Sequence, residues 1–532
     1  MSSITTSFPA KSVTGLLFLP LLIFGSCKKD DPQPQDVISP EISLVGVTDQ
    51  SSVWNTVPLT LDAADATGIA KVEIYVDGVL VSTLTAPPYA LSWNSNDVTD
   101  GAHSIRGVAY DNSGNKSEKV VSVTVKNILV SINIAADQLS TDIKIRERGF
   151  VFLSDENGKV ISVSEYKNSD KVTLKNPDFN GEYFYLTEVS KDTFGISLAT
   201  FAQIERGKNW VLINPLPDNY AESATLNFLN AKPSPTYYYD AAPNGNVTYT
   251  IDEDHITSMA SLRKSPTDLF VTLYDRDKGT PLKYFFYSGI TAGANTIDLA
   301  QVTKDFSTQD FTFSDEFDWS SLRIYGLPDA NNFDEYYSLS RYYYVRDLPN
   351  QQQSQKLYFP GSTFPTYYSE YYANSKNTFY EKGSTHDLLK LDLIKNDISF
   401  TFNENKLTYS ASGDFDFFTI LVGPTDSPWQ FALPERNGVL PMFDIPAILK
   451  SYPIPAIDIP FAHIVQDYEN MTGYEDLKSF IRKSGRSLSE LYGVGINHTS
   501  ILYLKPTTGG RLRPHRPFTR WNFEKHRQEL PL

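Results

Sequence analysis

The sequence predicts an all-β protein built of tandem β-sandwich domains, with minor helices near the C-terminus. Tyrosine and phenylalanine each occur 32 times, and both favour the half-buried surface of a sheet. Short runs that alternate apolar and polar residues recur along the chain, separated by turn residues such as Asp77-Gly78. The apolar spacing of a helix is clearest near the C-terminus, at 474–491.

The first 26 residues have the order of a secretory signal peptide. Lys11 precedes an apolar run at 16–24, and the small residues Gly25 and Ser26 follow this run. The run is too short to cross a bilayer, which needs about 20 apolar residues. Cys27, the single cysteine of the chain, comes next, so we expect an exported protein without disulfide bonds.

The junction Phe24-Gly25-Ser26-Cys27 resembles the lipobox of bacterial lipoproteins, in which the cysteine is diacylated and becomes the new N-terminus. This resemblance implies that Cys27 is lipidated and that membrane lipid is a partner, since two acyl chains suffice for stable anchoring. The alternative is an ordinary buried cysteine that follows the signal.

A second resemblance concerns the residues directly after Cys27. Lys29, Asp30 and Asp31 look like the signal that sends lipoproteins of the Bacteroidota to the outer face of the outer membrane. The expected location is therefore the cell outer membrane, with the protein lipid-anchored and facing outside. The lipidated cysteine and a proline-rich stalk would occupy 27–40.

Residues 41–126 show about seven short strands with turn signals at the spacing typical of a sandwich. Four segments resemble the bacterial immunoglobulin-like domains of surface proteins, in order and at the family's spacing. They are KVEIYVDG at 71–78, PYALSW at 88–93, DGAH at 100–103 and AYDNSGN at 109–115. The resemblance implies a spacer or an adhesive module in which Trp93 belongs to the core.

Three further β-rich domains and a tail are expected after this domain. We predict a β-sandwich-type domain at 127–247, a β-rich domain with an aromatic loop at 248–386 and a C-terminal β-rich domain with short helices at 387–506. A similar strand–turn–strand pattern near 150 and near 270 indicates either a duplication or simple hairpin convergence. The tail at 507–532 is basic, in contrast to the acidic chain.

Composition and motifs argue against several classes of function. The net charge of −16 argues against nucleic acid as a partner. The seven histidines lack metal-ligand spacing, and no nucleophile elbow or phosphate loop is present. Asp275-x-Asp277-x-Gly279 begins like a calcium loop, but Phe286 stands at its twelfth position. We therefore assign no catalytic, cofactor-binding or metal-binding residues.

Clustered tyrosines are the strongest sign of a ligand site. An exposed tyrosine can stack on a sugar ring and form hydrogen bonds at its edge. The alternative is that tyrosine simply suits strands. The residues predicted to form a ligand platform are Tyr237, Tyr239, Tyr342, Tyr343, Tyr367 and Tyr371.

The sequence thus favours a non-catalytic, surface-displayed binding or adhesion lipoprotein whose partner is a polysaccharide or another surface protein. An extracellular enzyme that cleaves glycan or peptide, with its site within 264–506, is the first alternative. A structural spacer of the cell surface is the second.

Overall fold

The computed structural model describes much of the chain after residue 34. The described ranges are 35–136, 138–141, 147–193, 195–212, 222–232, 235–244, 249–251, 256–262, 264–330, 335–349, 352–375, 378–385, 394, 396–403, 406–423, 428–434, 436–455, 457, 460–469, 471–483 and 498–504. They form two compact units. The first comprises 35–51, 57–93 and 102–123, and the second comprises 52–56, 94–101 and the described residues from 124 onward.

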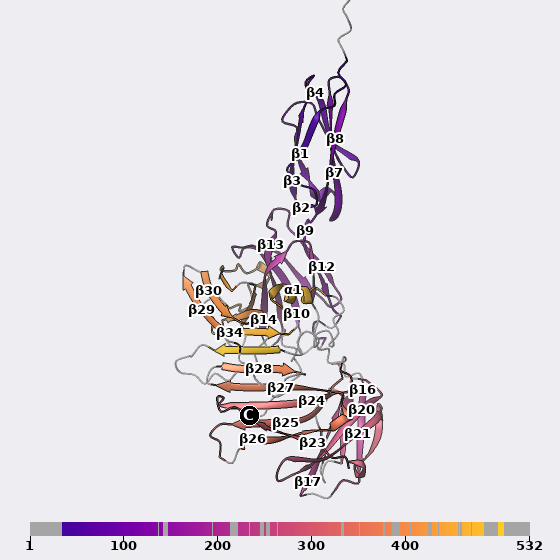
Figure 1. Ribbon diagram of the computed structural model, residues 1–532, viewed down its shortest axis with the longest axis vertical. Coiled ribbons are helices and arrows are strands. Elements are labelled where there is room, and N and C mark those ends of the chain that lie inside the picture. The colour runs from indigo at the N-terminus through magenta and orange to yellow at the C-terminus, as the bar shows by residue number, and fades with distance from the viewer. Residues whose placement is uncertain are drawn as a thin grey trace, which may run out of the picture. The chain divides into compact units, whose positions relative to one another are not determined.

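Two sheets form the immunoglobulin-like region (Figure 1). One has the order β1 (Glu41–Val45), β3 (Thr56–Ala64), β6 (Ala90–Asn94). The other has the order β2 (Ser51–Val53), β8 (Lys116–Val125), β7 (Gly101–Asp111), β4 (Ile69–Val76), β5 (Val79–Leu84). Trp93 is 3% exposed, as predicted for a core residue. The turn Asp77-Gly78 has positive φ at both residues, which a tight hairpin requires.

A twelve-stranded sheet dominates the second unit (Figure 1). Its order is β11 (Val160–Tyr166), β10 (Arg148–Ser154), β13 (Tyr183–Lys191), β14 (Ile196–Glu205), β32 (Trp429–Leu433), β31 (Phe417–Val422), β34 (Ala462–Tyr468), β35 (His498–Leu504), β28 (Thr378–Ser384), β27 (Thr366–Ser375), β24 (Trp319–Leu327), β25 (Tyr337–Val345). Strands β14 and β32 are parallel, with Ala199 opposite Gln430. Strands of all three predicted domains after residue 126 therefore pair in one sheet, and whether each segment folds separately stays a prediction.

Smaller sheets in the same unit accompany this sheet. They are β12 (Lys171–Lys175), β9 (Ile128–Ile134), β15 (Lys208–Leu212); β19 (Thr257–Leu262), β16 (Glu222–Leu229), β22 (Gly293–Asp298); β18 (Tyr249–Ile251), β17 (Tyr237–Pro243), β20 (Thr267–Asp275), β21 (Thr280–Ile290); β23 (Ser307–Thr312), β26 (Ser354–Phe359); and β29 (Asn396–Asn403), β30 (Lys406–Gly413), β33 (Asn437–Leu440). Strands β10, β14 and β31 contribute to two cores, because their alternate side chains point to opposite faces of the sheet.

One α-helix is described, α1 (Tyr474–Ile481), at the start of the stretch predicted to be helical. The rest of that stretch, from 484, lies outside the described residues. Four apolar or aromatic side chains of α1 are buried against the twelve-stranded sheet, and they are Tyr474, Leu477, Phe480 and Ile481. Lys478 is fully buried as well, and its Nζ donates to the carbonyl of Gln203 at 2.8 Å and to Glu205 at 3.1 Å.

The buried lysine gives a first testable prediction. Lys478→Ala should lower the free energy of unfolding by about 2–4 kcal/mol, because the half-buried carboxylate of Glu205 and the carbonyl of Gln203 lose a charged donor and the buried stem of the lysine is removed. Urea unfolding followed by tryptophan fluorescence measures this change. Lys483→Ala, at an exposed neighbouring position, should change stability by less than about 0.5 kcal/mol. Equal effects of the two substitutions would contradict the structural role of Lys478.

Candidate functional site

Four neighbouring strands of the twelve-stranded sheet carry a group of tyrosines, arginines and glutamates on one face. We call it the tyrosine–arginine face. Its residues are Ser321, Arg323 and Tyr325 of β24, Arg341 and Tyr343 of β25, Tyr368, Glu370 and Tyr372 of β27, and Glu381 of β28. They share a face because directly paired residues point to the same side and alternate residues of a strand do too.

The strand register places these residues in rows across the sheet. One row contains Tyr343, Ser321, Tyr372 and Glu381. The next row contains Arg341, Arg323 and Glu370. A third pairs Tyr325 with Tyr368. Strand β25 is the last strand of the sheet, so Arg341 and Tyr343 lie at its edge.

The arginine row is electrostatically unusual. Arg323 lies opposite Arg341 on one side and opposite Glu370 on the other. Desolvation, and then the charge of Arg323, lowers the pKa of Arg341, although a guanidinium stays protonated at neutral pH. Burial raises the pKa of Glu370 to about 8, against the opposing effect of Arg323. The hydroxyl of Tyr325 donates to Oε2 of Glu370 at 2.9 Å.

Most aromatic rings of this face pack against another ring or a guanidinium, and the ring of Tyr343 is exposed. Tyr325 meets Tyr336 edge-on, with ring centroids 5.6 Å apart, and stacks with Tyr368 at 6.1 Å. The guanidinium carbon of Arg323 lies 5.9 Å from the ring centroid of Tyr372. Tyr343 is 53% exposed. The exposed ring of Tyr343 can stack on the apolar face of a sugar, and the neighbouring exposed residue Arg341 can donate to oxygen atoms at the edge of that sugar.

The structure does not bring the six predicted platform tyrosines together on one surface. Tyr237 and Tyr239 belong to β17 in another sheet. Three of the six belong to hydrophobic cores, and these are Tyr239, Tyr342 and Tyr371, which are 2%, 9% and 4% exposed. Tyr237 and Tyr367 are half-buried, and the hydroxyl of Tyr367 donates to the carbonyl of Gly361 at 2.6 Å. Of the six, Tyr343 is the ring that faces solvent.

Sequence reasoning missed the polar part of this face. Arg323, Arg341 and Glu370 stand in the middle of strand-like runs, where a charge is costly unless it is paired or exposed. That position was the available signal. The paired arginines follow only from the strand register, which the sequence does not reveal.

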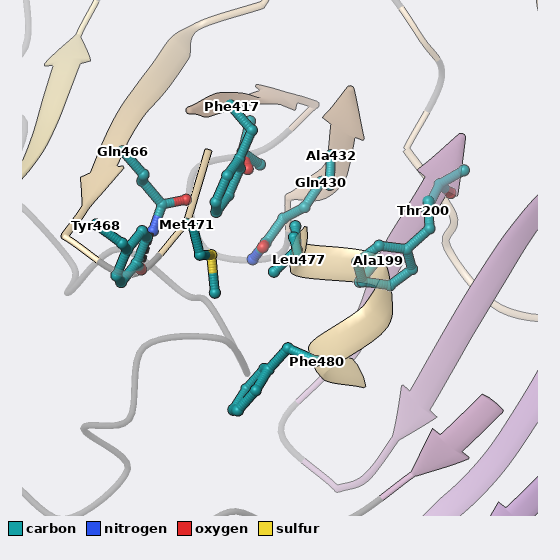
Figure 2. A pocket seen from close by; sticks show the side chains of 12 residues that line it. Ala199, Thr200, Phe417, Gln430, Ala432, Gln466, Tyr468, Met471, Leu477 and Phe480 are labelled. Atoms are coloured by element: carbon teal, nitrogen blue, oxygen red, sulfur yellow. Dashed lines mark hydrogen bonds between the residues drawn. The ribbon is translucent and has the colours of Figure 1, made fainter. Parts of the chain in front are cut away.

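A small pocket lies between α1 and the sheet (Figure 2). Figure 2 shows the amide of Gln430 pointing toward Met471 and Leu477, and no described residue forms a hydrogen bond with Oε1 of this amide. Gln466 donates to the hydroxyl of Tyr468 at 2.9 Å. The free volume is about 20 Å³, which is enough for a water molecule but not for a sugar. The pocket belongs to the packing of α1.

Three carboxylates gather in the immunoglobulin-like region. Asp36, Asp65 and Asp111 each offer an oxygen within 4.8 Å of the others. Asp111 accepts hydrogen bonds from the backbone N–H groups of Ser113 and Asn115, both at 2.8 Å. The side chain of Thr67 donates to Asp65 and to Asp36. These hydrogen bonds give the three carboxylates a structural role, because they hold the neighbouring turns in place.

Several predicted features lie outside the described residues: the signal peptide, Cys27, the residues Lys29, Asp30 and Asp31, and the basic tail. They stay predictions. The part of the chain that the structure describes contains no helix of the length and hydrophobicity that a membrane span requires.

Comparisons with known proteins identify the first β region. Residues 40–106 match the family model described as a bacterial Ig domain, which confirms the immunoglobulin-like prediction there. No curated protein matches the sequence.

Solved structures resemble parts of the chain. Fibronectin(III)-like modules of Clostridium thermocellum CbhA are 23% identical, over 16% of this chain and 94% of theirs, with a TM-score of 0.15. SGBP-B of the Bacteroides ovatus mixed-linkage glucan utilization locus, solved with a mixed-linkage heptasaccharide, is 11% identical over 58% and 92%, with a TM-score of 0.15. A structure from a 1.5-MDa bacterial ice-binding adhesin is 13% identical over 49% and 100%, with a TM-score of 0.16. With TM-scores this low, none of the three is equivalent to the whole chain.

Glu370 gives a testable dependence of stability on pH. Its pKa rises from the ordinary 4.5 to about 8 on folding. Between these pH values the unfolded chain loses the proton and the folded chain keeps it, so the free energy of unfolding falls as pH rises. Glu370→Gln should remove this decrease, which is on the order of 2–4 kcal/mol, since one pKa unit corresponds to about 1.4 kcal/mol.

Urea titrations of wild type and Glu370→Gln at pH 5 and pH 8 measure the effect. The variant should gain stability relative to wild type at the higher pH. Asp397→Asn, at an exposed carboxylate, is the control. Parallel pH profiles for wild type and Glu370→Gln would show that Glu370 is ionised in the folded protein at both pH values.

Proposed function

We propose that this protein is a non-catalytic, surface-displayed lipoprotein that binds polysaccharide through the tyrosine–arginine face. The observation that carries the proposal is the exposed ring of Tyr343 beside the exposed Arg341 at the edge of a large sheet. Flat aromatic rings with neighbouring polar groups are what sugar recognition requires. A rigid sheet also holds these groups in place without a large loss of entropy on binding.

The proposal includes the way the binding face is presented. Cys27 would carry the lipid that holds the protein on the outer face of the outer membrane, with Lys29, Asp30 and Asp31 as the export signal. The proline-rich stalk and the bacterial Ig domain would then serve as a spacer between the membrane and the binding face.

An enzyme that cleaves glycan is the second candidate. One observation favours it: Glu370 has the raised pKa of a general acid, and the nearby Glu381 contributes to that shift. Glu370 is only 8% exposed, however, and its carboxyl group already accepts a hydrogen bond from the hydroxyl of Tyr325. Both features argue against direct contact of this group with a substrate. An assay that measures polysaccharide binding and depolymerisation in the same samples separates the two candidates. Retention without cleavage supports the binding protein, and cleavage supports the enzyme.

The binding proposal predicts a specific loss in one variant. Tyr343→Ala should weaken retention on a polysaccharide ligand by about fivefold or more, because the exposed ring supplies the stacking surface. Affinity electrophoresis in gels that contain candidate polysaccharides measures this retention. Tyr183→Ala, at a ring that is 52% exposed on the distant strand β13, is the matched control and should behave as wild type. Equal retention of both variants would count against this face.

The anchoring proposal predicts a change in cell fractionation. Cys27→Ser should release the protein from the membrane fraction, because a single cysteine is available for acylation. Immunoblots of membrane and soluble fractions measure the distribution. Persistence of the variant in the membrane fraction would contradict a lipid anchor at Cys27.

A further inference from the structure

The tyrosine–arginine face contains two positive charges directly opposite each other. Arg323 and Arg341 are cross-strand partners of β24 and β25. Like charges at such positions destabilise a sheet, because their Cβ atoms are only about 4.5–5.5 Å apart. A structure that keeps this pair gains stability when an anion lies between or above the two guanidinium groups.

The carboxylates of the face do not neutralise both arginines. Glu370 lies opposite Arg323, on the side away from Arg341. Glu381 lies in the neighbouring row, opposite Tyr372. Among the described residues, no carboxylate lies within ion-pair distance of Arg341. Arg341 is an exposed residue of the edge strand β25, so a ligand can reach its side chain.

The position of Arg341 relative to Tyr343 indicates what kind of anion fits. The two residues are separated by one position on β25, so both side chains point to the same side, about 7 Å apart along the strand. A sugar that stacks on Tyr343 would place a charged substituent near Arg341. A guanidinium binds carboxylate and sulfate groups through two parallel N–H donors.

We infer that the tyrosine–arginine face selects anionic polysaccharide, with Tyr343 stacking on the sugar ring and Arg341 binding its carboxylate or sulfate group. This inference rests on the proposed polysaccharide-binding function and adds the chemical class of the ligand. The whole chain has a net charge of −16, so the attraction must be local rather than a long-range effect. At physiological ionic strength the Debye length is about 8 Å, which screens distant acidic groups but not a direct contact.

The test compares charged and neutral polymers on the full exported protein. Polygalacturonate supplies carboxylates, carboxyl-reduced polygalacturonate is its neutral counterpart, and dextran sulfate against dextran provides the sulfate arm. Affinity electrophoresis and isothermal titration at 0.15 M salt measure binding. The expected result is binding of at least one charged polymer at least about tenfold tighter than of its neutral counterpart.

Variants identify the residue that contacts the charge. Arg341→Gln should lose at least about tenfold in affinity for the charged polymer, and Arg341→Lys should recover only part of it, because lysine cannot bind two oxygens in a planar fork. Lys406→Gln removes one positive charge at an exposed position of β30 and should have no effect. Thermal unfolding confirms that each variant is folded.

The outcomes separate the inference from the proposal on which it rests. If the Arg341 variants lose affinity for polygalacturonate alone, the charged group of the ligand is a uronate carboxylate. If they lose affinity for dextran sulfate, it is the sulfate group of a sulfated sugar. Equal affinity for charged and neutral polymers, with a loss in Tyr343→Ala, would overturn the anionic class and leave polysaccharide binding intact. Binding of no polymer in either arm would overturn both.

Discussion

The structure depends on backbone pairing between strands that are far apart in the sequence. The parallel pair β14–β32 joins Ala199 to Gln430, and the antiparallel pair β28–β35 joins Lys382 to Thr499. These two pairings lie after the fourth and after the eighth strand in the order of the sheet. Without them the twelve-stranded sheet would separate into three blocks of four strands: β11-β10-β13-β14, β32-β31-β34-β35 and β28-β27-β24-β25. The buried Trp429 reinforces the first pairing, because its Nε1 donates to the hydroxyl of Thr200 at 2.7 Å. If these contacts were lost, strand edges that are now paired would expose unpaired N–H and C=O groups to solvent.

The same sheet explains how the tyrosine–arginine face is held. Its core side packs Leu322, Tyr342 and Tyr371 into one hydrophobic cluster, and this packing fixes the backbone. Arg341 and Tyr343 then project from the opposite side at fixed spacing. A site built on paired strands keeps its geometry better than a site on loops. Its exposed residues, Arg341 and Tyr343, lie on the edge strand β25, where a polymer can reach them.

Local patterns predicted well what local contacts determine. The immunoglobulin-like region could be located because each hairpin carries its own turn signal, as Asp77-Gly78 does, and α1 begins where apolar spacing placed it. The sequence could not reveal the shared sheet, because its long-range pairings leave no local signal. Alternation predicts that Tyr342 and Tyr343 face opposite sides, but which of them is buried depends on the cluster that covers one side of β25. The pairing of Arg323 with Arg341 was not predictable either, because it follows from the register between β24 and β25, which the sequence does not reveal.

Hydrogen–deuterium exchange of the exported protein, with and without a bound polysaccharide, locates the surface that binds the polymer. If the tyrosine–arginine face is the binding surface, slower exchange on binding will be concentrated in β24, β25 and β27, while the bacterial Ig domain will be unchanged. Slower exchange confined to residues 40–106, with none in these three strands, would rule out the tyrosine–arginine face and place binding in the bacterial Ig domain instead.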